Sequence, residues 1–212
     1  MRVLEVGPWN CPAEGYLVDP DVEAYVAAEL GVWEGNHEGF CSIEVFNKVL
    51  KRVQDDADRN DSSYPTVAFY KAPVSAIPDT DFDRIIAANV FGDPLAVPKN
   101  PDGTLKPPID QTSIMVRSLA RKIAGGGVLE IVEGYTPIPH EVLFDLLGKA
   151  GFELDELLVG QDDFADSLKR LYPYNYRKKL RSMDFVTRLI SAQNYGIEGG
   201  VTDPYIATFR LA

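Results

Sequence analysis

The chain has little of the chemistry that metal sites and disulfide frameworks need. Its 212 residues include only two cysteines, Cys11 and Cys41, and two histidines, His37 and His140. No Cys-x-x-Cys pair and no paired-histidine spacing is present, so the sequence predicts neither a metal centre nor a disulfide scaffold. The first residues follow a strand pattern rather than that of a signal peptide, and we expect a cytoplasmic protein with reduced thiols.

Positive charge is also scarce, with 21 Lys and Arg against 32 Asp and Glu, which gives a net charge of -11. Nucleic acids and anionic membranes repel a chain of this charge, which argues against both as partners. No apolar run approaches the roughly 20 residues that a membrane-spanning helix needs. One local exception to the acidic background is the basic, aromatic segment 169–181, "KRLYPYNYRKKLR".

What the chain does have is 45% hydrophobic residues, enough for the core of one domain. Apolar runs typical of strands occupy 3–6, 16–18, 66–70, 82–91, 128–135, 152–159 and 204–212. Helical spacing of apolar residues occurs at 21–30, 42–58, 111–124 and 139–150. Such alternation predicts a Rossmann-like α/β fold, with a mainly parallel sheet and helices on both faces. We expect one domain over 1–212, with insertions at about 94–110 and 162–200.

Four fragments, in this order, resemble the class I S-adenosylmethionine-dependent methyltransferases. They are "VLEVGPWNCPAEGYLVDPD", "IPDTDFDRIIAANVF", "LARKIAGGGVLEIVEGYTP" and "LLGKAGFELDELLVG". The first is most similar to a subgroup whose first crossover is short. The resemblance implies S-adenosylmethionine as cofactor, methyl transfer to an oxygen or nitrogen of a small molecule, and an antiparallel last strand, "YIATFRLA".

The resemblance places the methionyl end of the cofactor at the first loop, where Gly7, Asn10 and Gly15 would face the ligand. Glycine lets a backbone approach a ligand closely because it has no Cβ. The chain departs from the family's glycine motif here, since Pro8 lacks an N–H and Trp9 replaces the second glycine. A tight strand connection without a ligand is the alternative interpretation of this loop.

Two further positions concern the adenosyl group. Asp19, at the expected end of the second strand, would accept hydrogen bonds from the ribose hydroxyls. It would equally suit the N-cap of a helix that starts near Asp21. After the third strand the family has an acid for the adenine, but this chain has Pro73 near that position. Ser75 is the nearest polar substitute.

Polar residues also follow the fourth and fifth expected strands, at the edge where reacting groups gather in open α/β folds. Asn89 would contact the cofactor, and Asp93 would orient or deprotonate the acceptor, unless it only forms an Asp-Pro turn. Tyr135 faces the same edge by the same logic. His140, in the first turn of a helix, is expected at the surface, and His37 is a weaker candidate base.

The basic segment 169–181 suits a phosphorylated, carboxylated or stacked small molecule, because tyrosines stand beside Arg and Lys. A solvated helix start that balances the acidic bulk is the alternative interpretation. The sequence also leaves three functions open. One is a methyltransferase, and another is a non-catalytic relative that binds or scaffolds and has lost the cofactor. The third is an enzyme of altered chemistry that uses the same pocket. Trp9 and the missing acid near Pro73 distinguish the first two.

Overall fold

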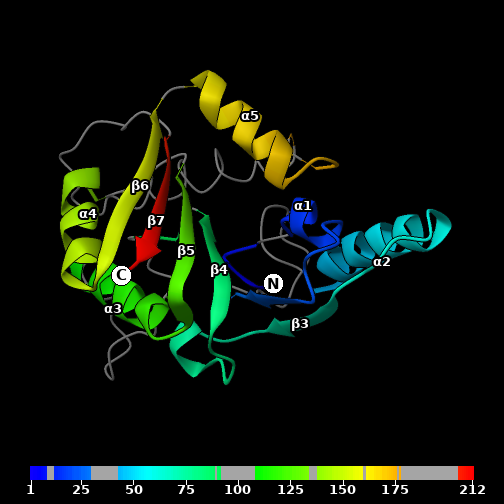
Figure 1. Cartoon of the computed structure of the whole chain (residues 1–212), viewed down its shortest axis with the longest axis horizontal. Helices are drawn as coiled ribbons and strands as arrows, with labels where there is room; N and C mark the ends of the chain where they lie inside the picture. The colour runs from blue at the N-terminus through cyan, green and yellow to red at the C-terminus, as the bar shows by residue number, and fades with distance from the viewer. Residues whose placement is uncertain are drawn as a thin grey trace.

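The computed structural model describes residues 1–8, 12–29, 43–88, 90–91, 108–133, 138–159, 161–175, 177 and 205–212. Within these ranges the strands are β1 (Arg2–Val6), β2 (Ala24–Ala28), β3 (Thr66–Tyr70), β4 (Phe82–Ala88), β5 (Ile123–Glu133), β6 (Phe152–Val159) and β7 (Tyr205–Leu211). The helices are α1 (Glu14–Leu17), α2 (Ile43–Arg59), the short η1 (Val74–Ala76), α3 (Pro108–Ala120), α4 (His140–Lys149) and α5 (Gln161–Leu171). Figure 1 shows their arrangement.

All seven strands form one sheet in the order β3-β2-β1-β4-β5-β7-β6. The pairs among β1 to β5 are parallel, and only β7 runs against its neighbours β5 and β6. The carboxyl ends of the six other strands therefore lie along one edge. This is the expected Rossmann-like sheet with an antiparallel last strand.

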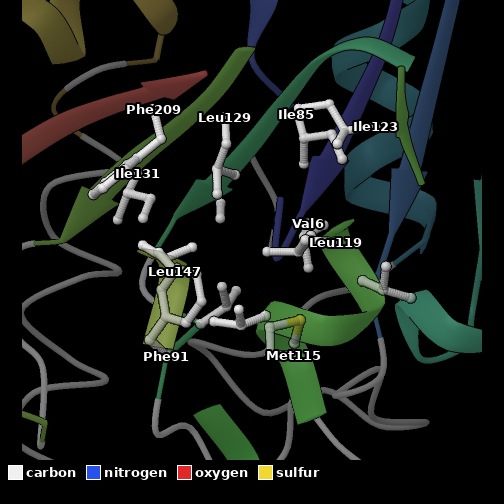
Figure 2. Packing of buried hydrophobic residues seen from close by; sticks show 14 of the residues in the cluster. Val6, Ile85, Phe91, Met115, Leu119, Ile123, Leu129, Ile131, Leu147 and Phe209 are labelled. Atoms are coloured by element: carbon white, nitrogen blue, oxygen red, sulfur yellow. The ribbon is translucent and has the colours of Figure 1, made fainter. Parts of the chain in front are cut away.

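Helices cover both faces of the sheet, as the alternating pattern predicted. Ile85 belongs to the cluster that packs under α3 and α4, whereas its neighbour Ile86 packs under α1, α2 and α5. Successive residues of a strand point to opposite faces, which explains the division. Figure 2 shows the cluster that contains Ile85, with Met115 and Leu119 of α3 close to the sheet residues.

Two predictions of secondary structure near the N-terminus are wrong. Residues 16–18 are the end and C-cap of the short helix α1 rather than a strand, and half of 21–30 is the strand β2 rather than a helix. The strand lies between β1 and β3, with helices on its two faces, so four of its five residues are buried. A strand buried on both faces shows no alternation, and its apolar residues fit a helical spacing by chance.

Other differences concern boundaries. The glycines at 125–127 lie inside β5, which begins at Ile123, and do not end a helix. A register shift between Phe82 and Arg84 accommodates them against β4. Of the expected insertions at 94–110 and 162–200, residues 94–107, 176 and 178–200 lie outside the described residues. Residues 108–110 belong to α3, and 162–171 belong to α5. The single-domain organisation stays a prediction.

Candidate functional site

The candidate site lies at the carboxyl edge of the sheet, where β1 ends between β2 and β4. The sheet extends from β1 through β2 to β3 on one side, and from β1 through β4 to β5 on the other. In open α/β sheets, ligands bind outside the carboxyl ends of the strands, at the point where the strand order reverses. The residues that follow β1, β2 and β4 therefore define the candidate site.

Gly7 makes the turn after β1, at a position where the structure leaves no space for a side chain. Its φ is +74°, and its amide donates to the carbonyl of Ala28 at 3.0 Å. A Cβ on Gly7 would stand 2.5 Å from Val90 Cγ1 and 3.1 Å from the carbonyl oxygen of Ala88. The ends of β1, β2 and β4 thus converge on this glycine. Its role in facing a ligand stays a prediction.

A buried carboxylate, Glu5, holds the far end of the same turn. Its Oε2 accepts hydrogen bonds from the amide of Ala13 at 2.8 Å and from the hydroxyl of Tyr25. Its Oε1 accepts from the hydroxyl of Tyr172 at 2.8 Å. Glu5 therefore fixes the backbone where the chain leaves the turn. Sequence reasoning missed this residue, although an acid inside an apolar strand two positions before Gly7 was a visible signal.

Glu29, rather than Asp19, is the acid that follows the second strand. Glu29 comes directly after β2, is 9% exposed, and donates its amide to the carbonyl of Tyr70 at 3.0 Å. The strand pairing joins Val6 to Ala28, so Gly7 and Glu29 each follow one member of the same pair. The two residues therefore end adjacent parallel strands at the same level.

Asp19 precedes β2, so its expected place at the end of that strand is wrong. Its Oδ1 accepts from the amide of Asp21 at 2.9 Å, which closes a turn that leads into the strand. The helix-cap alternative is also wrong, because a strand and not a helix follows. One signal favoured Glu29: it lies 22 positions after Gly7, close to the spacing of about 20 between the glycine turn and the ribose-binding acid of dinucleotide folds.

Gly15 lies within α1 and packs against the end of α5. A Cβ on Gly15 would stand 2.4 Å from the carbonyl oxygen of Arg170 and 3.3 Å from that of Leu171. The structure thus gives Gly15 a packing role that is independent of any ligand. It permits the backbones of two helices to approach closely.

Ser75 lies in η1, exposed, just beyond the carboxyl end of β3. It is therefore at the expected edge. No acid occurs between β3 and Pro78. The first one, Asp79, accepts from the hydroxyl of Tyr70 at 3.1 Å and pairs with Arg2 at 3.2 Å. Its observed contacts are thus with other parts of the chain.

The ends of β4 and β5 are joined by a second buried acid. Glu133, the last residue of β5, accepts hydrogen bonds from the amides of Val90 and Phe91 at 3.2 and 3.4 Å. Tyr205 of β7 pairs with Glu133 in register. Burial, and then the charge of Glu133, raise the pKa of Tyr205, so this phenol stays protonated at neutral pH. His140 lies near the ring of Tyr205 but has a half-exposed side chain, 3.1 Å from Glu141.

Several residues that the sequence singled out lie outside the described residues, namely Trp9, Asn10, Cys11, His37, Cys41, Asn89, Asp93 and Tyr135. For two of them, the sequence position relative to a strand is clear. Asn89 follows β4 directly, and Tyr135 comes two residues after the end of β5. The roles expected for these residues stay predictions.

The described part of the basic segment makes contacts within the chain. Arg170 pairs with Glu130 of β5 at 2.6 Å, and Lys169 pairs with Asp166 at 2.7 Å. The hydroxyl of Tyr172 donates to Glu5, as described above. Arg170 and Tyr172 thus dock the segment on the domain, whereas the Lys169 pair lies within α5. Residues 176 and 178–181 of the segment lie outside the described ranges.

A further acid, Glu14 of α1, holds the same segment. Its carboxylate accepts hydrogen bonds from the amide of Tyr174 at 3.0 Å and from the side chain of Asn175. Burial raises the pKa of Glu14, although both hydrogen bonds act in the opposite direction.

Two negative findings apply to the described parts of the chain. They contain no group of three or more His, Cys, Asp or Glu side chains that could hold a metal ion. They also contain no helix that is long and apolar enough to cross a membrane.

No protein-family model matches the sequence. The curated proteins likewise yield no match. Structures with the same fold nevertheless exist. The N-methyltransferase NodS from Bradyrhizobium japonicum WM9, in complex with S-adenosyl-L-homocysteine, aligns with a TM-score of 0.52 and 12% identity over 99% of this chain and 77% of that chain. The 16S rRNA methyltransferase KamB aligns with a TM-score of 0.57 and 14% identity, over 100% of this chain and 87% of that one.

A third solved structure with this fold is described as a cyclase. It is SpnF, with a TM-score of 0.50 and 16% identity over 99% of this chain and 73% of that chain. The chain therefore shares the fold of class I S-adenosylmethionine-dependent methyltransferases. Identities this low show a common fold and leave the reaction to be argued from the site.

Proposed function

We propose that this chain binds S-adenosylmethionine at the carboxyl ends of β1 and β2 and transfers the methyl group to an oxygen or nitrogen of a small molecule. One observation carries the proposal. Gly7 and Glu29 follow a pair of hydrogen-bonded parallel strands, at the point where the strand order reverses. A glycine turn beside an acid at this point is the arrangement that binds adenosine-containing cofactors in related α/β folds.

The residues present fit two parts of the cofactor and fit a third less well. Gly7 makes the tight turn beside which the methionyl end would lie, and a Cβ there would overlap Val90. The Glu29 carboxylate can accept hydrogen bonds from both ribose hydroxyls. Pro8 offers no N–H, and the stretch after β3 up to Pro78 has no acid for the adenine amino group. The adenine would then depend on backbone groups and on Ser75.

When bound, the cofactor supplies a methyl group on a positively charged sulfur, open to in-line attack. The main task of the chain is to hold the two reactants in line, because positioning supplies most of the rate in such a transfer. We propose that Asp93 and Tyr135, which follow β4 and β5, orient the acceptor. Where the nucleophile is a hydroxyl, the Asp93 carboxylate would accept its proton.

The alternative is a non-catalytic binding or scaffolding protein that keeps this fold and has lost the cofactor. Trp9 in the place of a glycine and Pro8 beside it are the features that favour it. SpnF, described as a cyclase, illustrates that the fold hosts another reaction. Measurement of cofactor binding separates the two proposals.

The first experiment is calorimetric titration of the chain with S-adenosylmethionine and S-adenosylhomocysteine. We expect Glu29→Gln to weaken both ligands by about ten- to a hundredfold, the value of hydrogen bonds to a charged group. Asp19→Asn is the matched control, and it should leave both dissociation constants unchanged. Equal loss in the two variants, or loss only in Asp19→Asn, would contradict the assignment of Glu29.

Trp9→Gly tests the proposal as a whole. If the Trp9 ring fills the ligand position, this variant should bind more tightly than the natural chain. If the ring turns outward, the two should bind alike. Absence of binding at millimolar ligand in both proteins would overturn the proposed cofactor.

A further inference from the structure

Residues 161–175, which comprise α5 and the four residues after it, form a docking segment that extends from the end of β6 toward α1 (Figure 1). Three buried acids on three elements hold it. Glu130 of β5 pairs with Arg170 at 2.6 Å, and Glu14 of α1 accepts from the amide of Tyr174 at 3.0 Å. Glu5 of β1 accepts from the hydroxyl of Tyr172 at 2.8 Å.

Two of the contacts of this docking segment reach the turn after β1. The first runs from the Tyr172 hydroxyl through the Glu5 carboxylate to the amide of Ala13, where the chain leaves that turn. The second contact is steric: the carbonyl oxygen of Arg170 lies against Gly15 of α1, two residues after Ala13. The segment thus contacts the acid that precedes the turn, Glu5 of β1, and the helix that follows it, α1.

We propose that Tyr172 is a positioning residue that acts through Glu5 on Ala13, and that docking of residues 161–175 and binding of the adenosyl ligand stabilise each other. This inference rests on the proposed function for the identity of the ligand. Glu5 is fully buried, so its carboxylate keeps one orientation only while its donors remain. Loss of the Tyr172 donor removes the hydrogen bond to Oε1 while Tyr25 and Ala13 still donate to Oε2. The carboxylate is then held less firmly, and the anchor of Ala13 weakens with it.

The coupling is thermodynamically reciprocal. If a docked segment holds the turn in the arrangement that binds the ligand, the ligand must favour the docked segment by the same factor. A turn that is already ordered also loses less entropy on binding. A purely structural Tyr172 would instead lower stability and leave the affinity of the folded protein unchanged.

The test compares Tyr172→Phe with Tyr174→Phe. Both keep the ring, and Tyr174 holds Glu14 through its backbone amide while its own side chain is 45% exposed. We expect Tyr172→Phe to raise the dissociation constant of S-adenosylhomocysteine by about five- to twentyfold. Tyr174→Phe should change it by less than about twofold. Melting temperatures of both variants, without ligand, report the structural contribution separately.

Hydrogen exchange supplies a readout that needs no ligand. The amide of Ala13 should exchange faster in ligand-free Tyr172→Phe than in the natural chain or in Tyr174→Phe. In the natural chain, added ligand should slow exchange across 164–172. If the natural chain binds and Tyr172→Phe binds equally well, the coupling is overturned, whatever happens to the melting temperature. If the natural chain binds nothing, the proposed function fails, and unchanged Ala13 exchange in Tyr172→Phe then overturns the positioning role as well.

Discussion

Single residues explain why a buried sheet carries charge. Glu5, Glu130 and Glu133 lie in β1 and β5 and are at most 1% exposed. A buried carboxylate without partners costs several kcal/mol, so each must be hydrogen-bonded by groups from elsewhere in the chain. Glu130, for example, accepts from the hydroxyl of Tyr16 at 2.9 Å and pairs with two arginines. Each of these acids is therefore an anchor for a segment outside the sheet.

The first prediction concerns the space around Gly7. Gly7→Ala should destabilise the protein by about 2–4 kcal/mol. Alanine at this position would have to keep the positive φ, and its Cβ would overlap Val90. Gly126→Ala is the matched control, since Gly126 has the same φ of +74° but no atom within 4 Å of a new Cβ. It should cost about 1 kcal/mol, the cost of the left-handed backbone alone. Urea unfolding measures both, and equal costs would contradict the steric argument.

The candidate site was only partly predictable at the scale of residues. The turn at Gly7 could be predicted, because a glycine directly after a buried strand favours a tight turn, and its contact with a ligand stays a prediction. Asp19 was assigned to the end of the second strand because the sequence predicted that strand at 16–18, whereas it lies at Ala24–Ala28. The internal roles of Arg170 and Tyr172 could not be predicted, since their partners Glu130 and Glu5 lie far away in the sequence.

At the scale of elements, most segments were predictable from their apolar patterns, and the first crossover was not. The helix α2 and the strand β6 occupy the expected ranges within a few residues. The first crossover failed because its two pieces are short: α1 has four residues, and β2 has five with three alanines. Alanine favours helices in isolation, and only pairing with β1 and β3 makes this segment a strand.

Contact between α1 and α5 gives the second prediction. Gly15→Ala should destabilise the protein by about 1–3 kcal/mol, because its Cβ would meet a backbone carbonyl that cannot move independently of α5. Gly148→Ala in α4 is the control, because no atom lies within 4 Å of the new Cβ. There the helix propensity of alanine should stabilise the protein by about 0.5–1 kcal/mol. Destabilisation by Gly148→Ala of the same size as by Gly15→Ala would contradict the packing argument.

For the whole molecule, the sheet topology brings distant residues to one edge. Glu5 and Tyr172 are 167 residues apart in the sequence and share a hydrogen bond. The parallel order of β1 to β5 places Gly7, Glu29 and Glu133 at the ends of strands along the same edge. The sequence pattern predicts each strand separately. Which residues lie next to each other at the edge of the sheet follows only from the order of the strands.

The charge of the whole molecule bears on the acceptor. KamB acts on 16S rRNA, according to its description, and has the same fold. This chain has a net charge of -11, and two basic residues of its basic segment, Lys169 and Arg170, already pair with acids. Binding to nucleic acid draws much of its free energy from basic residues that neutralise phosphates. A small molecule is therefore the acceptor that the charge distribution favours.

The last prediction follows from this charge. In a mobility-shift experiment with a 16S rRNA fragment, the chain should show no binding at micromolar concentration, even at about 50 mM salt, where electrostatic attraction is strongest. A basic RNA-binding domain of similar size serves as the positive control. The same result is expected with S-adenosylhomocysteine present, because the ligand does not reverse the acidic surface. Binding below micromolar concentration that weakens steeply as salt rises would show that a basic face exists among residues 178–204, and the proposed acceptor would then have to be RNA.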